Sequence, residues 1–184
     1  MVVSEFMITF ANVGQKIYIV MKKFCLTLCM ALFSLLASAT GIELSQGKAT
    51  YLNDGGKIGV VFNLDYAKLE DGKSVKTEWA SQYDAYTQEG RKFFMNGFNE
   101  AIQGKRMIKE DSVAAFSMYV EFTKFVVSGG KYKVWADITV TDSNAAETVC
   151  MYKVTEFEID TDATGFSNYT ETMKAMAAEL SQVK

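Results

Sequence analysis

The stretch "FSMYVEFTKFVVSGGKYKVWADITVTD", residues 116–142, decides the fold. Apolar and polar side chains alternate over Phe116–Thr123, and they alternate again over Lys131–Val140. Strict alternation is the pattern of a β-strand with one buried face. Between the two runs, Ser128-Gly129-Gly130 provides residues that accept the backbone angles of a tight turn. The stretch therefore predicts two antiparallel strands, each with one face in the core.

The segments before and after this stretch extend the predicted sheet. Asn53-Asp54-Gly55-Gly56 predicts a hairpin turn between two antiparallel strands, Lys48–Leu52 and Lys57–Asp65. The run Ile58–Phe62 is apolar at consecutive positions, which indicates a central strand covered on both faces. Val149–Ile159 is predicted as the last strand, and its irregular alternation favours a bulge.

Two helices complete the domain. Apolar or small residues recur three and four positions apart over residues 74–103, and this spacing predicts a long helix. Gly90 and Gly97 lie on its apolar stripe, where we expect them to allow close approach to the sheet. A second helix is predicted from about Ser167 onward. The order β-β-α-β-β-β-α predicts an α+β, two-layer sandwich: a largely antiparallel sheet of about five strands with two helices on one face.

Residues 21–39 have the three parts of a secretory signal peptide. A lysine pair is followed by the apolar run Phe24–Leu36 and by a small-x-small cleavage site that ends at Ala39. The run is shorter than the ~20 residues that a membrane-spanning helix needs. We therefore expect residues 1–20 to be a mis-assigned upstream start, and residues 40–184 to form a single domain in the periplasm or outside the cell.

Composition excludes several classes of function. The chain has no histidine, which excludes Ser-His-Asp and Cys-His catalysis and zinc sites that need imidazole. The part after Ala39 keeps 16 of the 19 basic and 21 of the 22 acidic residues, for a net charge of −5. Nucleic acid is therefore not expected as a partner, because binding to its phosphates depends on clustered basic residues. Cys150 is the one cysteine outside the signal region, so no internal disulfide is expected.

The order of elements, with "KIGVVF" (Lys57–Phe62) and "NYTETMKAMAAEL" (Asn168–Leu180), resembles a group of uncharacterised secreted or periplasmic proteins of Gram-negative bacteria. Their fold is similar to the amino-terminal domain of TolB-type proteins and to lipoproteins that activate penicillin-binding proteins. The resemblance covers most of residues 42–182. It implies a non-enzymatic envelope protein and carries over no site residues.

Trp135 is the leading candidate for a binding residue. In its strand it alternates with the apolar set, so we expect it on the polar face of the sheet, together with Tyr119 and Phe125. Aromatic side chains on a polar face are typical anchors for a protein or a carbohydrate. The alternative is that another segment, such as Ile42–Leu44, covers them.

"DTDATGFSNYTE", residues 160–171, matches a calcium-binding loop at several positions. Carboxylate, hydroxyl and amide oxygens are the hard ligands that calcium prefers, and a glycine allows the bend. The matching ligand positions are Asp160, Asp162, Thr164, Asn168 and Glu171. The same segment also fits an acidic connection from a strand to a helix, so we expect no cofactor and keep calcium as the alternative.

Two further patterns have a structural and a functional interpretation. Glu156 and Glu158 alternate along the last strand, and a carboxylate-based hydrolase could use them, but an exposed strand face explains them as well. Trp79, Tyr83 and Tyr86 form an aromatic stripe that could stack on a sugar, whereas helical periodicity favours the core.

The sequence as a whole favours an exported bacterial envelope protein that acts by binding and not by catalysis. Its partner would be an envelope protein, a glycan or another copy of itself, and no integral membrane span would remain after signal cleavage. The alternatives are the hydrolase and a calcium-stabilised structural module.

Overall fold

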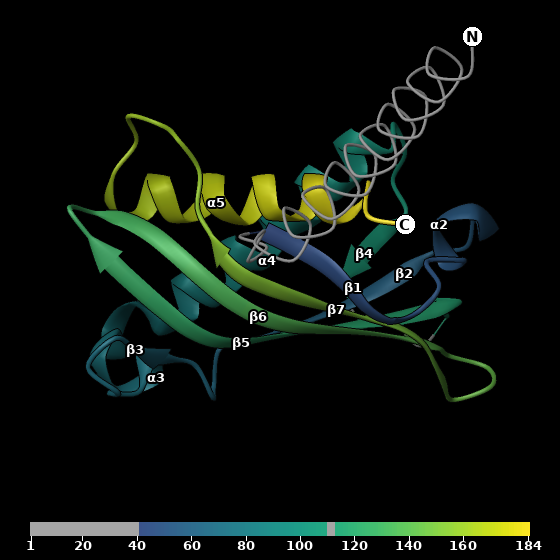
Figure 1. The fold of residues 1–184 in the computed structure, drawn as a ribbon, viewed down its shortest axis with the longest axis horizontal. Coiled ribbons are helices and arrows are strands. Elements are labelled where there is room, and N and C mark those ends of the chain that lie inside the picture. The colour runs from purple at the N-terminus through teal and green to yellow at the C-terminus, as the bar shows by residue number, and fades with distance from the viewer. Residues whose placement is uncertain (1–40, 110–112) are drawn as a thin grey trace, which may run out of the picture. The chain divides into compact units, whose positions relative to one another are not determined.

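A computed structural model describes residues 41–109 and 113–184, which belong to one compact unit (Figure 1). The predicted upstream start and signal peptide lie outside the described residues. The strands are β1 (Gly41–Gly47), β2 (Ile58–Asn63), β3 (Lys68–Leu69), β4 (Met107–Lys109), β5 (Phe116–Ser128), β6 (Lys131–Asp142) and β7 (Glu147–Phe157). The helices are α2 (Tyr51–Asp54), α3 (Val75–Glu78), α4 (Tyr83–Ala101) and α5 (Gly165–Leu180), with a short 3-10 turn, η1 (Ala80–Gln82).

The seven strands form one mixed sheet in the order β1-β7-β6-β5-β2-β4, and β3 pairs with β5 beyond the end of β2. The three pairings that join β1, β7, β6 and β5 are antiparallel. The pairings of β2 with β5 and β4, and of β3 with β5, are parallel. The predicted combination of helices with one large sheet is confirmed, whereas the expectation of about five largely antiparallel strands was too simple.

The predicted hairpin at Asn53–Gly56 is wrong. Tyr51–Asp54 form the short helix α2, and Gly55, with φ of 80°, ends it in the left-handed conformation. Glycine serves a helix end as readily as a hairpin turn, because both need a positive φ. The first strand is β1 and not Lys48–Leu52, and its partner is β7, from Gly41 opposite Thr155 to Gly47 opposite the buried Cys150.

The prediction of a central strand at Ile58–Phe62 is confirmed. β2 lies between β5 and β4, and Ile58, Gly59 and Val60 are all buried. β4 was not predicted, because three residues are too few to show a period. The meander of β5, β6 and β7 is confirmed, including the turn at Gly129-Gly130 and register shifts between β6 and β7.

The predicted long helix is divided into α3, η1 and α4, and its glycines serve mainly the contact between helices. A side chain at Gly97 would collide with the backbone of Lys174 in α5. A side chain at Gly90 would meet the Tyr169 hydroxyl of α5 and the Phe62 ring of β2. The expected approach to the sheet is therefore correct only for Gly90.

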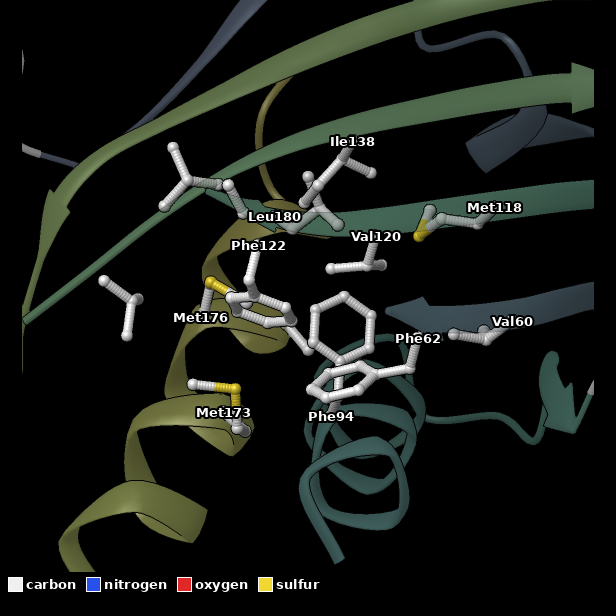
Figure 2. Close-up of a cluster of buried hydrophobic side chains, with 14 of the residues drawn as sticks. Val60, Phe62, Phe94, Met118, Val120, Phe122, Ile138, Met173, Met176 and Leu180 are labelled. Atoms are coloured by element: carbon white, nitrogen blue, oxygen red, sulfur yellow. The ribbon is translucent and has the colours of Figure 1, made fainter. Parts of the chain in front are cut away.

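The core lies between one face of the sheet and the two long helices, α4 and α5 (Figure 2). We call this the covered face. Phe94 of α4 and Met173, Met176 and Leu180 of α5 reach toward the strands. The strand residues that meet them, at most 6% exposed, are Val60, Phe62, Met118, Val120, Phe122 and Ile138. Burying such side chains contributes about 1.5–3 kcal/mol each, so this layer dominates the stability of the fold.

Candidate functional site

The polar side of the sheet, which we call the open face, carries two of the three predicted binding residues. Tyr119 and Trp135 alternate with buried residues and so point away from the covered face. Tyr119 is 42% exposed, and Trp135 is partly buried. Ile42–Leu44 lies in the plane of the sheet, paired with Tyr152–Val154 of β7. That segment therefore does not cover Trp135.

The third predicted binding residue, Phe125, is not on the open face. It is fully buried, and its ring stacks on Phe122 with centroids 5.3 Å apart. The register of β5 and β6 shifts between Phe122 and Lys124, and this bulge reverses the alternation. Simple alternation from Phe122 would leave Phe125 on the polar side, so the inserted residue made the prediction wrong.

Charged groups surround Trp135. The ammonium nitrogen of Lys124 lies 4.7 Å from the centre of the Trp135 ring, a cation–π contact. On the neighbouring position of β6, Lys133 Nζ is 3.8 Å from Glu156 and 3.6 Å from Glu158. The two carboxylates of the hydrolase hypothesis are thus members of an ion-pair cluster. Glu156 has φ of 51°, in keeping with the shift of register opposite Trp135.

The residues of the proposed calcium loop are not brought together. Asn168 is 1% exposed, and its Oδ1 accepts a hydrogen bond of 2.8 Å from the backbone N–H of Tyr132. Glu171 accepts a hydrogen bond from Thr161. Within residues 41–109 and 113–184, no three acidic or thiol side chains are grouped so that they could hold a metal ion. The expectation of no cofactor stays a prediction, with calcium as its alternative.

A second candidate site lies at the end of the core where β5 turns into β6. Six aromatic rings, which we call the aromatic cluster, meet there: Trp79, Tyr86, Phe125, Tyr132, Phe166 and Tyr169. Trp79 lies 4.4 Å from Tyr86 and 5.3 Å from Phe125, measured between ring centres. Tyr86 lies 4.7 Å from Tyr169. Four elements and the joint between α3 and η1 supply these rings, so the cluster is a tertiary feature.

Hydrogen bonds fix the tyrosines of the cluster. The hydroxyls of Tyr86 and Tyr132 are 2.9 Å apart, and the Tyr169 hydroxyl donates to the backbone oxygen of Tyr86 at 3.0 Å. Burial raises the pKa of Tyr132 and of Tyr169 well above the usual value, so both stay neutral. The cluster is therefore a rigid, uncharged aromatic wall.

A hollow of about 400 Å³ opens beside this wall. Its lining consists of Trp79, Phe125 and Tyr132, with Val127, Leu69 at the end of β3 and the loop residues Glu70 and Asp71. Val127 is 43% exposed, although it shares the covered side of β5 with Phe125. The sequence pattern had suggested a core position for Trp79, and periodicity alone could not show that its partly buried ring also borders a hollow.

Comparisons with known proteins place the chain in no family. No family model matches it, and no curated protein matches it. Two solved structures of a PelC dodecamer from Paraburkholderia phytofirmans are similar at 14% and 15% identity, covering 78% of this chain and 98% of that one, with TM-scores of 0.48 and 0.49. A crystal structure of an uncharacterised protein is similar at 8% identity over 68% of this chain and 84% of that one, with a TM-score of 0.36. At this distance the similarity assigns no function.

Proposed function

We propose that this protein is exported to a bacterial envelope and acts there by binding, without catalysis, through the open face of its sheet. The partner is an envelope protein, a glycan or a second copy of the chain. One observation carries the proposal: the long helices pack on one side of the sheet, and Tyr119 and Trp135 stand on the other. Among residues 41–109 and 113–184, no helix is long and apolar enough to cross a membrane.

The chemistry of the open face suits recognition. Tyrosine and tryptophan supply large contact areas with little loss of conformational entropy, and they dominate the energetics of many interfaces. Near Trp135 stand Lys124, Lys133 and the carboxylates of Glu156 and Glu158. Such charges can orient a partner and hydrogen-bond to hydroxyl groups of a glycan.

Export is tested by the mature end of the protein. We expect cleavage after Ala39, so intact mass and amino-terminal sequencing of the native protein should show Thr40 as the first residue. Fractionation should place that form in the periplasm or the medium. An uncut chain that is found among cytosolic proteins contradicts the export part of the proposal.

Binding through the open face is tested by capture from the native envelope with a matched set of variants. Trp135→Ala and Tyr119→Ala should each release a captured protein or glycan, with losses of affinity of about tenfold or more if the residue is an anchor. Thr139→Ala is the control, because Thr139 is the direct neighbour of Tyr119 on the same face. Sedimentation of the same variants tests self-association. The proposal fails if the double variant Trp135→Ala/Tyr119→Ala keeps every partner and the oligomeric state of the parent.

A further inference from the structure

The hollow beside Trp79 lies where the long helices no longer cover the sheet and a different segment of the chain lies opposite it. The long helices leave Val127 of β5 exposed on the covered side, and the segment from Leu69 to Trp79 forms the opposite wall. That segment consists of the end of β3, a loop and α3. Because the bulge after Phe122 turns Phe125 inward, the floor of the hollow is aromatic and not polar.

The rings that border the hollow are held in place before any ligand arrives. Trp79 contacts Tyr86, Phe125 and Tyr132 with centres 4.4, 5.3 and 6.0 Å apart. The Tyr132 hydroxyl is engaged by Tyr86. A ligand therefore meets a fixed aromatic wall, and little conformational entropy is lost at that wall on binding.

The charged residues that line the hollow are both acidic. They are Glu70 and Asp71, and no lysine or arginine of the described chain lines it. Asp71 pairs with Lys73 at 3.1 Å, and Lys73 also lies 3.8 Å from Glu78, outside the lining. No ion pair joins Glu70 to another side chain in the part of the chain that the structure describes. The face of an aromatic ring is electrostatically negative and attracts a cation, and one face of Phe125 is already stacked on Phe122. The rings therefore favour a cation through the faces that are left to the hollow, and the acidic residues favour it by their charge.

We propose that this hollow binds a small organic ammonium ion, with its alkyl groups against Trp79, Phe125 and Val127 and its positive charge near Glu70 and Asp71. Its volume of about 400 Å³ is in the range of small-molecule sites. A fully hydrated inorganic cation would gain little binding energy from the rings of Trp79, Phe125 and Tyr132. An anion would be repelled by the carboxylates. This proposal does not depend on the open face or on export.

The two tryptophans of the chain provide the measurement. In a ¹H–¹⁵N spectrum their indole N–H groups give two signals, one from Trp79 in the hollow and one from Trp135 on the open face. Choline is the probe, titrated to roughly 50 mM because a single small cation is expected to bind in the millimolar range. We expect the Trp79 signal to shift and saturate. The Trp135 signal should stay in place, since Lys124 already lies over that ring.

A neutral ligand and four variants separate the effect of charge from the effect of shape. Dimethylbutanol, the neutral carbon isostere of choline, should bind about three- to tenfold more weakly than choline. Glu70→Gln should lower the affinity for choline by a factor of about three to ten. Glu89→Gln, which removes a carboxylate on α4 that pairs with Lys92, should leave the affinity unchanged. Val127→Lys places a tethered ammonium group at the hollow and should abolish the shift, and Val127→Gln should retain it.

Three results would overturn the proposal. The first is no shift of Trp79 with choline, and the second is an equal shift with dimethylbutanol. The third is a shift with a short acetylated and amidated lysine peptide but none with choline, which would assign the hollow to a partner's side chain. A folded Glu70→Gln variant with unchanged affinity would remove the carboxylate from the model of binding.

Discussion

Each end of the core contains a pair of buried tyrosines whose hydroxyls are in hydrogen-bond contact, and the two ends differ in the residues around that pair. At one end the hydroxyls of Tyr51 and Tyr152 are 3.2 Å apart, and at the other those of Tyr86 and Tyr132 are 2.9 Å apart. All four tyrosines are at most 8% exposed. At the first end Arg106 covers the tyrosine pair, so we call it the sealed end, although a separate hollow of about 660 Å³ opens nearby beside Asn99 and Met107. At the second end Tyr132 itself lines the hollow. A buried tyrosine pair therefore does not decide by itself whether an end of the core is open.

The sealed end is closed by an arginine whose hydrogen bonds go to the backbone. Arg106 donates to the carbonyl oxygens of Tyr51 at 2.6 Å, Leu52 at 2.7 Å and Gly56 at 3.2 Å. Asn99 in turn accepts from the backbone N–H groups of Arg106 and Met107 at 3.0 and 2.8 Å. These partly buried bonds tie α2, α4 and β4 together over the Tyr51 pair.

The hollow end has a polar link at the surface in addition to the buried hydrogen bonds of its tyrosines. Asp65 accepts hydrogen bonds from Lys76 at 2.8 Å and from the hydroxyl of Tyr83 at 2.7 Å. These groups join the loop after β2 to α3 and to the start of α4, and they are exposed to solvent. Ring packing and the buried hydrogen bonds of Tyr86, Tyr132 and Tyr169 hold the interior of this end. The comparison teaches that the donor at the tertiary link distinguishes the two ends: an arginine side chain bonded to backbone carbonyls at one, and tyrosine hydroxyls among packed rings at the other.

The largest effect is expected from breaking the ring packing at the hollow end. Phe125→Ala removes a fully buried ring and should lower the free energy of unfolding by about 3–5 kcal/mol. Urea unfolding followed by circular dichroism measures it. Tyr119→Ala on the open face is the control and should cost less than about 1 kcal/mol. Equal effects of the two variants would mean that Phe125 does not belong to the core.

A smaller loss is expected when the link at the sealed end is removed. Arg106→Met keeps much of the side-chain volume but leaves the carbonyl groups of Tyr51, Leu52 and Gly56 without this donor. We expect a loss of about 2–3 kcal/mol, because a partly buried carbonyl without a donor is costly. Hydrogen exchange should speed up around α2 and β4 and not around Trp79. The neighbouring, exposed Lys105→Met should change stability by less than about 0.5 kcal/mol.

The smallest effect is expected at the surface link of the hollow end. Hydrogen bonds from Lys76 and Tyr83 lower the pKa of Asp65 below its usual value. A lowered pKa in the folded state stabilises the protein above pH ~4, and this contribution is lost as the pH falls below that value. Because the groups are exposed, Asp65→Asn should cost at most about 1 kcal/mol at pH 7. Urea midpoints at pH 7 and pH 3 test this, and the difference between parent and variant should shrink at pH 3.

The sequence predicted the features that depend on local period. Alternation located the meander and placed Tyr119 and Trp135 on the side opposite the core. It failed at Phe125, because the alternation was continued past Phe122 across Thr123 and Lys124, two consecutive polar residues that mark the bulge in β5. The prediction of a hairpin at Gly55 failed because a residue with a positive φ can end a helix as well as form a hairpin turn. The hollow was out of reach, since Glu70, Trp79 and Tyr132 are brought together only by the tertiary fold.

Cys150 gives the fold a consequence for redox chemistry. Its thiol lies on the covered side of β7, in line with the buried Tyr152 and Val154, and burial raises its pKa, so little of the reactive thiolate form is present. Even in an oxidising compartment, this sulfur is protected from mixed disulfides for as long as the core stays packed against β7. Thiol oxidation would therefore occur in chains whose core has opened.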